Sequence, residues 1–222
     1  DRSWLSNDFI KFLREHFRNA KAMNWVETIH GRYVHDRRSR VLSGHLAKFI
    51  PKNVLVLDVG SGDGLLGQLI SEIRPDVTIR GIDVLVRPRT HIPTEKYDGE
   101  RIPYGDTSFD GVMFVDVLHH TADPMILLRE ATRVARRAIV IKDHLLDGLF
   151  ARQTLRFMDR AGNARHGVSL PYNYWTKETW YDAFDTLGLR VGMWTTKLGL
   201  YPRPTSWLFD RSLHFVARLD VA

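Results

Sequence analysis

The chain of 222 residues contains no cysteine. This absence excludes disulfide frameworks, thiol nucleophiles, iron–sulfur clusters and zinc sites with thiolate ligands. Its longest apolar runs, such as Val112–Val115 and Ala138–Ile141, are far shorter than the roughly 20 residues that span a membrane. Internal repeats, low-complexity tracts, long Pro/Gly linkers and a segment resembling a signal peptide are also lacking. We therefore expect a cytoplasmic protein with a single domain over residues 1–222.

The composition, 44% hydrophobic and 26% charged residues, is that of a soluble globular protein. The formal net charge is +6, and the charges are unevenly distributed. Residues 1–50 contain ten Lys/Arg and five Asp/Glu, so this segment alone carries a net charge of +5. Such a segment could bind nucleic acid, anionic lipid or an acidic substrate, or it could be the solvated face of helices.

Hydrophobic spacing predicts helices at the start of the chain, over Trp4–Phe17 and Arg32–Phe49, and alternating strands and helices after it. Two β-like segments close the chain and predict a hairpin. The expected strands are 53–59, 77–84, 94–97, 109–115, 138–141, 190–196 and 213–219, and the expected later helices end near Ile73 or cover 124–136, 149–161 and 177–187.

Strands that alternate with helices indicate βαβ units and a parallel sheet. We predict an α/β fold with a doubly wound, mostly parallel, Rossmann-like sheet of seven strands, a carboxy-terminal antiparallel hairpin and amino-terminal helices. Within this domain, residues 1–50 would form a helical cap, 51–144 a cofactor-binding half and 145–222 a substrate-side half.

A glycine-rich turn follows the first predicted strand, in the segment Val56–Gly67. Glycines there allow a sharp turn into a helix and a close approach of a ligand to the main chain. Two glycine patterns fit the segment, G-x-G-x-G from Gly60 and the dinucleotide pattern G-x-G-x-x-G from Gly62. In the first pattern the turn begins directly after the strand and Asp58 faces the ligand, where a carboxylate would repel a pyrophosphate but attract an ammonium group. This favours S-adenosylmethionine over NAD.

The glycine segment resembles motif I of the class I S-adenosylmethionine-dependent methyltransferases. A second segment, Tyr97–Asp110, followed by Val115–His120 and Asp123-Pro124, is similar to the subgroup that includes ubiquinone-biosynthesis enzymes (methyltransferase type 11). The resemblance covers about Val54 to Ile141. The flanking segments match no substrate-specific pattern.

This resemblance implies the residues that bind the cofactor. Asp83 and the adjacent Val84, about 20 residues after the glycines, would lie at the ribose, where the carboxylate accepts hydrogen bonds from both hydroxyl groups. The remaining implied contacts are Asp58 near the amino group; Gly60, Ser61 and Gly62 along the methionine and ribose; Asp98 and Gly99 at the adenine; and Asp116 and Val117 near the methionine end.

Candidate catalytic residues follow the fourth and fifth strands, whose carboxyl ends should face the ligand crevice. His119 or His144 could act as a general base, because an imidazole titrates near neutrality. Lys142, Asp143 and His144 directly follow an apolar strand and need partners, which could be each other or a substrate. We select His119, His144 and Asp143 as candidate catalytic residues. His120 is expected to be structural.

Candidate substrate contacts are Lys142 and the loop 163–175, where His166, Tyr172 and Tyr174 combine polar groups with aromatic walls. The same loop could instead be an ordered segment whose aromatic rings cover the sheet. No metal site is predicted, because the histidines show no H-x-x-x-H or H-E-x-x-H spacing.

The sequence thus predicts a methyltransferase for a small-molecule, lipid-like acceptor. The Phe-rich helix over residues 4–17 motivates the lipid option and a peripheral membrane contact. The basic segment motivates the alternative of an RNA or protein methyltransferase, but no N-P-P-Y-type tetrad follows the fourth strand, so nucleic acid is not expected as a partner. A further alternative is a non-catalytic S-adenosylmethionine-binding protein.

Overall fold

The computed structural model describes residues 37–163, 172–201 and 212–221. The chain divides into two compact units, Asp1–Arg38 and Ser39–Ala222, and nearly all described residues belong to the second. The helix predicted over residues 4–17 and the candidate His166 lie outside the described residues. Within the described part, no helix has the length and apolar character needed to cross a membrane.

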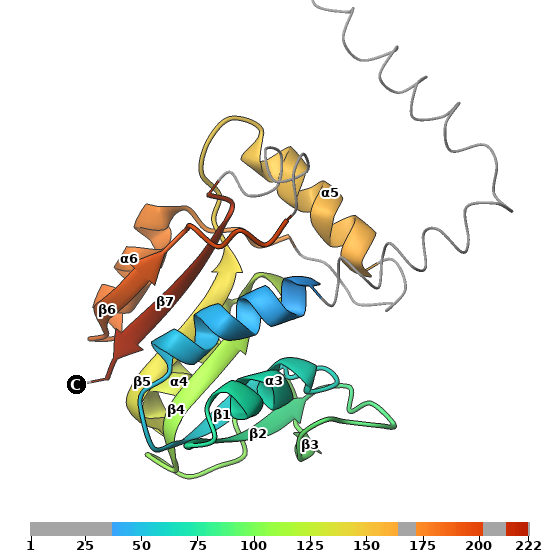
Figure 1. The fold of residues 1–222 in the computed structure, drawn as a ribbon. Coiled ribbons are helices and arrows are strands. Elements are labelled where there is room, and N and C mark those ends of the chain that lie inside the picture. Colours follow the sequence, from blue (N-terminus) through green and yellow to red (C-terminus); the bar gives the residue numbers. More distant parts are fainter. Residues whose placement is uncertain (1–36, 164–171, 202–211, 222) are drawn as a thin grey trace, which may run out of the picture. The chain divides into compact units, whose positions relative to one another are not determined.

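Within the described residues, seven strands form one sheet in the order β3-β2-β1-β4-β5-β7-β6 (Figure 1). Strands β1 to β5 pair in parallel, and β7 is antiparallel to both β5 and β6. The predicted doubly wound sheet with an antiparallel carboxy-terminal hairpin is therefore confirmed. The strands are β1 Val54–Val59, β2 Val77–Asp83, β3 Thr94–Lys96, β4 Phe109–Val115, β5 Ala135–His144, β6 Arg190–Thr195 and β7 His214–Asp220.

Helices cover both faces of the sheet, and each face has its own apolar core (Figure 1). A helix over residues 37–49 and α3 (Leu65–Ile73) bury side chains such as Leu46 and Ile70 on one face. On the other face, α4 (Pro124–Val134) and α6 (Lys177–Thr186) contribute Leu128 and Trp180. The short 3₁₀ helix Leu118–His120 follows β4, and α5 (Ala151–Asn163) follows β5.

Strand β5 is longer than predicted at both ends, and the preceding helix ends at Val134 rather than at residue 136. The apolar run that predicted the strand ends at Ile141, but Lys142, Asp143 and His144 also pair with β7. Lys142 pairs with both β4 and β7, and pairing with β7 alone extends the strand through Asp143 and His144, which a hydrophobicity pattern excludes. Three ionisable residues therefore lie within a buried strand and not in the loop after it.

Candidate functional site

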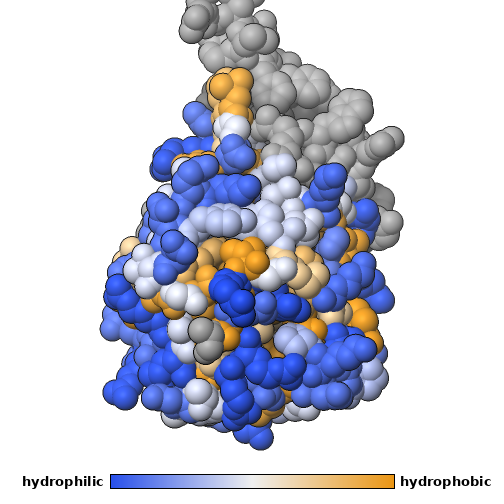
Figure 2. Space-filling model, turned by 90° about the vertical axis from the view of Figure 1, so that its left-hand side faces the viewer, coloured by the Kyte–Doolittle hydropathy of each residue, from blue (hydrophilic) through white to orange (hydrophobic). Residues whose placement is uncertain are grey.

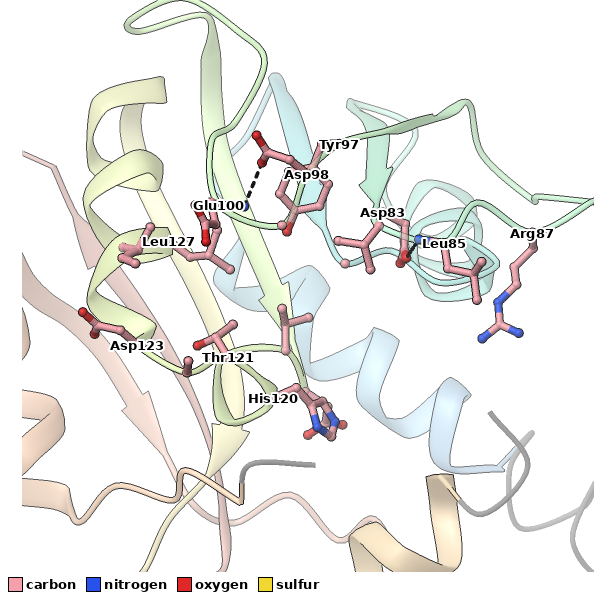
Figure 3. A pocket seen from close by; sticks show the side chains of 17 residues that line it. Asp83, Leu85, Arg87, Tyr97, Asp98, Glu100, His120, Thr121, Asp123 and Leu127 are labelled. Carbon is pink, nitrogen blue, oxygen red and sulfur yellow. Dashed lines mark hydrogen bonds between the residues drawn. The ribbon is translucent and has the colours of Figure 1, made fainter. Parts of the chain in front are cut away.

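A pocket of about 460 Å³ lies at the carboxyl ends of β1, β2 and β4. Figure 3 shows that the loops after β2 and β3 form one side of it, and the segment after β4 with the start of α4 forms the other. Most residues predicted to bind the cofactor line this pocket, namely Gly60, Asp83, Val84, Asp98, Gly99, Asp116 and Val117. Asp58, Ser61 and Gly62 are not among its lining residues.

The glycine turn lies where the strand order reverses, between β1 and β4. Gly60 has a φ of +74°, and a Cβ atom there would lie 2.6 Å from Val117 Cγ2. Both the backbone conformation and the close approach therefore require glycine. The main-chain N–H groups of Gly60 and Ser61 donate to Ile82 O at 2.8 and 3.2 Å, which ties the turn to the end of β2. Ligand crevices in open α/β sheets form at such a switch point.

Asp83 is the last residue of β2, and its side chain forms hydrogen bonds with the glycine turn and with the loop after β2. Its Oδ2 accepts from the Gly62 N–H at 2.8 Å, and its Oδ1 accepts from the Leu85 N–H at 2.8 Å. A carboxylate has about four acceptor positions, so Asp83 can hold the backbone and accept further hydrogen bonds from a ligand. This arrangement is compatible with the predicted ribose contact.

Asp58 lies in β1, one residue before the strand ends, and is only 3% exposed. Burial, and then the negative charge of Asp83, raise its pKa to about 7. A buried carboxylate in this position would be stabilised by a cationic group brought in by a ligand.

The loop after β3 is shaped by Asp98. Its Oδ1 accepts from the N–H groups of Glu100 and Arg101, both at 2.8 Å, and these hydrogen bonds lower the pKa of the carboxyl group. Figure 3 shows the carboxylate beside the Glu100 N–H. The adenine contact implied for Asp98 stays a prediction.

Several lining residues were missed by the sequence analysis. Those in the same loops as the identified motifs could have been predicted, because neighbouring residues of a loop line the same pocket. Those on α4 could not, because their positions depend on how α4 packs against β4. The missed residues are Leu85, Arg87, Tyr97, Glu100, His120, Thr121, Ala122, Asp123, Ile126 and Leu127.

A second group of polar residues lies behind the pocket, at the ends of β4 and β5. Asp116 follows β4 with a left-handed backbone (φ +57°), and its N–H donates to Lys142 O at 2.9 Å. The fully buried Lys142 Nζ contacts Asp116 Oδ1 and lies 3.4 Å from His214 Nδ1. Lys142, predicted as a substrate contact, therefore pairs with a residue of the pocket wall.

The three candidate catalytic residues meet in this buried group. His119 Nδ1 lies 2.6 Å from Asp143 Oδ1 and 3.2 Å from His144 Nδ1. The N–H groups of Leu118 and His144 also donate to Asp143, at 3.0 and 2.6 Å. Asp143 is fully buried, and His119 and His144 are 2% and 4% exposed.

Burial and charge set the ionisation of these residues. Burial opposes ionisation of Asp143, but the charge and hydrogen bond of His119 outweigh it and hold the pKa of Asp143 far below its usual range. Burial also opposes protonation of His119, yet Asp143 raises its pKa. Burial lowers the pKa of His144, and burial with the neighbouring His119 lowers that of His120 to about 4.

Helix α5 adds a carboxylate that the sequence analysis missed. Asp159 lies one helical turn after Leu155 on the buried face of α5 and accepts a hydrogen bond from the Tyr174 hydroxyl group. Its two oxygens lie 3.6 Å from His119 Nε2 and 3.8 Å from His144 Nε2. The candidate Tyr174 is thus part of the buried group, whereas Tyr172 packs near it with Arg156 above its ring.

Comparison with known proteins identifies the family. The profile of the family described as "Methyltransferase domain" matches residues 32–192. The chain is 27% identical, over 133 residues, to 27-O-demethylrifamycin SV methyltransferase of Amycolatopsis mediterranei. That match covers 50% of this chain and 48% of the relative, so the chain spans about half the length of the curated relative that it matches.

Solved structures share the fold. One is a chain of the complex between the Haloferax volcanii Trm112 methyltransferase activator and a methyltransferase, with a TM-score of 0.63, 16% identity and coverage of 91% of this chain and 97% of that chain. Another is an S-adenosylmethionine-dependent methyltransferase from Thermotoga maritima, with a TM-score of 0.61, 16% identity and coverage of 90% and 98%. The family match covers most of the chain, so the chain belongs to the methyltransferase domain family, and its fold is that of S-adenosylmethionine-dependent methyltransferases.

Proposed function

We propose that the protein transfers the methyl group of S-adenosylmethionine to a small-molecule acceptor whose oxygen or nitrogen atom carries a proton. The observation that supports this most directly is the buried group of His119, Asp143 and His144 beside Asp116 of the pocket wall. Buried ionisable groups next to a cofactor pocket are typical of sites that handle a proton. The matched relative is named for methyl transfer to 27-O-demethylrifamycin SV, a small molecule.

In this reaction the bond between the methyl carbon and the sulfonium sulfur breaks, and a bond from the carbon to the acceptor atom forms. The acceptor releases its proton. Holding the two reactants in line can contribute about 7 to 11 kcal/mol. The glycine turn and Asp83 would hold the cofactor, and His119, Asp143 and His144 would prepare the acceptor atom for loss of its proton.

A lipid-like acceptor is supported by apolar side chains at the start of α5 and along it. Leu149, Phe150 and Phe157 are 76%, 61% and 62% exposed. On the face drawn in Figure 2, hydrophobic surface is limited to small areas within a largely hydrophilic surround. Exposed large apolar side chains that gather near a helix end can contact an apolar ligand.

The test is a transfer assay with S-adenosylmethionine that carries a labelled methyl group, incubated with a cell extract separated into small-molecule, protein and RNA fractions. We expect label in the small-molecule fraction, and in its organic phase if the acceptor is lipid-like. Asp83→Ala is the control, because it should abolish the transfer in every fraction. Label in protein or RNA would overturn the proposal, as would cofactor binding without transfer to any fraction.

A further inference from the structure

Four potential metal ligands meet where β4 and β5 end. Asp116 follows β4, His119 lies in the 3₁₀ helix after it, and Asp143 and His144 are the last two residues of β5. One ligand atom from each residue lies within 4.8 Å of all the others. We propose that Asp116, His119, Asp143 and His144 bind a divalent transition-metal ion at the inner wall of the cofactor pocket.

The distances between the ligand atoms suit such an ion. The sides of the triangle formed by His119 Nδ1, His144 Nδ1 and Asp143 Oδ1 are 2.6, 3.2 and 3.6 Å. A circle through these atoms has a radius of about 1.9 Å, so a point about 1 Å above their plane lies roughly 2.1 Å from all three, the usual length of a zinc–nitrogen or zinc–oxygen bond.

The hydrogen-bond chemistry of the group points the same way. A neutral imidazole has one N–H and one lone pair. The two Nδ1 atoms lie 3.2 Å apart, and His119 Nδ1 lies 2.6 Å from Asp143 Oδ1. Where His119 Nδ1–H donates to Asp143, His144 Nδ1 can direct its lone pair into the same buried group. A cation between these atoms would satisfy all of them at once.

The charges around the group also favour a cation. Three carboxylates, from Asp116, Asp143 and Asp159, lie at or next to the site. Lys142 contacts Asp116, whereas the fully buried Asp143 lies against two imidazoles and two backbone N–H groups. Buried carboxylates require compensation by positive charge. A protonated His119 can supply this charge for Asp143, and a divalent ion bound by the neutral imidazoles would supply it in its place.

The ligand set defines the class of ion and its access. Two imidazoles and two carboxylates favour Zn²⁺, Mn²⁺, Fe²⁺ or Co²⁺ over Mg²⁺ and Ca²⁺, which prefer oxygen ligands alone. His119, Asp143 and His144 are buried, but the Asp116 side chain is 23% exposed and lines the pocket. An open coordination position would therefore face the pocket.

The role of the ion rests on the proposed function. An acceptor oxygen bound at the open position would have a lowered pKa and would release its proton to water as the methyl group is transferred. Binding of the ion itself does not depend on the identity of the acceptor. The sequence analysis predicted no metal site, because the ligands come from two strands and follow no local histidine spacing.

The experiment measures metal binding in the full chain after removal of metals with a chelator. Co²⁺ is added while its visible absorption is recorded, and Zn²⁺ is then used to displace it. We expect one tight equivalent, with at least about tenfold weaker binding in His119→Gln and in His144→Gln. His91→Gln is the matched control, because His91 is exposed and lies outside the ligand set, and its metal affinity should equal that of the unmodified protein.

Thermal stabilisation by S-adenosylhomocysteine establishes that each variant is folded. Should one histidine variant fail to fold, the other carries the test. The proposal is overturned if the protein binds no metal. It is also overturned if the folded ligand variants bind metal as tightly as the unmodified protein, because the ion would then lie elsewhere. In either case His119 and Asp143 would form a pair that holds a proton. The acceptor screen can fail while metal binding succeeds, and the reverse, so the two proposals are tested separately.

Discussion

Ionised Asp58 should destabilise the folded protein above neutral pH. Asp58 lies in β1, two residues before Gly60, and is 3% exposed, and burial raises the pKa of its carboxyl group from the ordinary value of 3.8 to about 7. Because the folded pKa is raised, the contribution of this group to stability is fully present below about pH 4 and is lost as the pH rises to 7. At 1.36 kcal/mol per pKa unit, the loss is about 4 kcal/mol in all.

The variant Asp58→Asn removes this dependence, since an amide stays neutral. The free energy of unfolding of the variant minus that of the unmodified protein should increase by roughly 2 to 3 kcal/mol from pH 5 to pH 8. Urea denaturation of both proteins at the two pH values measures the gain. Histidines and other groups titrate alike in both proteins and cancel from the comparison.

Asp76→Asn is a suitable control. Asp76 pairs with Arg74 at 2.7 Å, and this hydrogen bond lowers the pKa of its carboxyl group, so it stays ionised throughout this pH range. Its replacement should change stability equally at pH 5 and pH 8. The reasoning about Asp58 is refuted if the difference between Asp58→Asn and the unmodified protein is the same at both pH values, or if the variant is relatively less stable at pH 8.

Three further substitutions probe the pocket and the buried group. Asp83→Ala removes the acceptor for the Gly62 N–H, so the thermal stabilisation by S-adenosylhomocysteine should disappear. In the unmodified protein this stabilisation is worth about 2.7 kcal/mol at 100 times the Kd. An unfolding temperature that still rises with the ligand would contradict the assignment of Asp83 to the cofactor site. Gly60→Ala would place a Cβ atom 2.6 Å from Val117, and calorimetry should show loss of cofactor binding, whereas unchanged affinity would show that the turn adapts. Tyr174→Phe removes a buried donor to Asp159 and should lower the free energy of unfolding by about 1 to 3 kcal/mol, measured in urea, and a neutral result would contradict the hydrogen bond.

The cofactor half of the protein could be predicted from the sequence because its signals are local. The turn of Gly60 directly follows a strand of apolar residues, and Asp83 ends the next one, so both positions are fixed by short stretches of chain. The strand Phe109–Val115 is bounded as predicted. Parallel order then brings these strand ends to one edge, where the pocket lies.

The buried group could be predicted only in part. That His119 and Asp143 lie near each other follows from the neighbouring positions of β4 and β5. The contribution of Asp159 does not, because it depends on how α5 packs over the strand ends, and helix packing is decided by side chains distant in sequence. The length of β5 was also missed, since its pairing with β7 extends the strand beyond its apolar run.

The missed length of β5 has its physical cause in the requirements of a buried strand. A strand that pairs on both sides within an α/β sheet is normally an almost continuous apolar run. Placing Lys142, Asp143 and His144 in such a strand desolvates three ionisable groups, and apolar residues of similar size would avoid that penalty. Fold stability therefore does not explain their presence. The sites where local rules fail are expected to be functional, and here the failure lies next to Asp116 of the pocket wall, where the proposed function places the loss of the acceptor's proton.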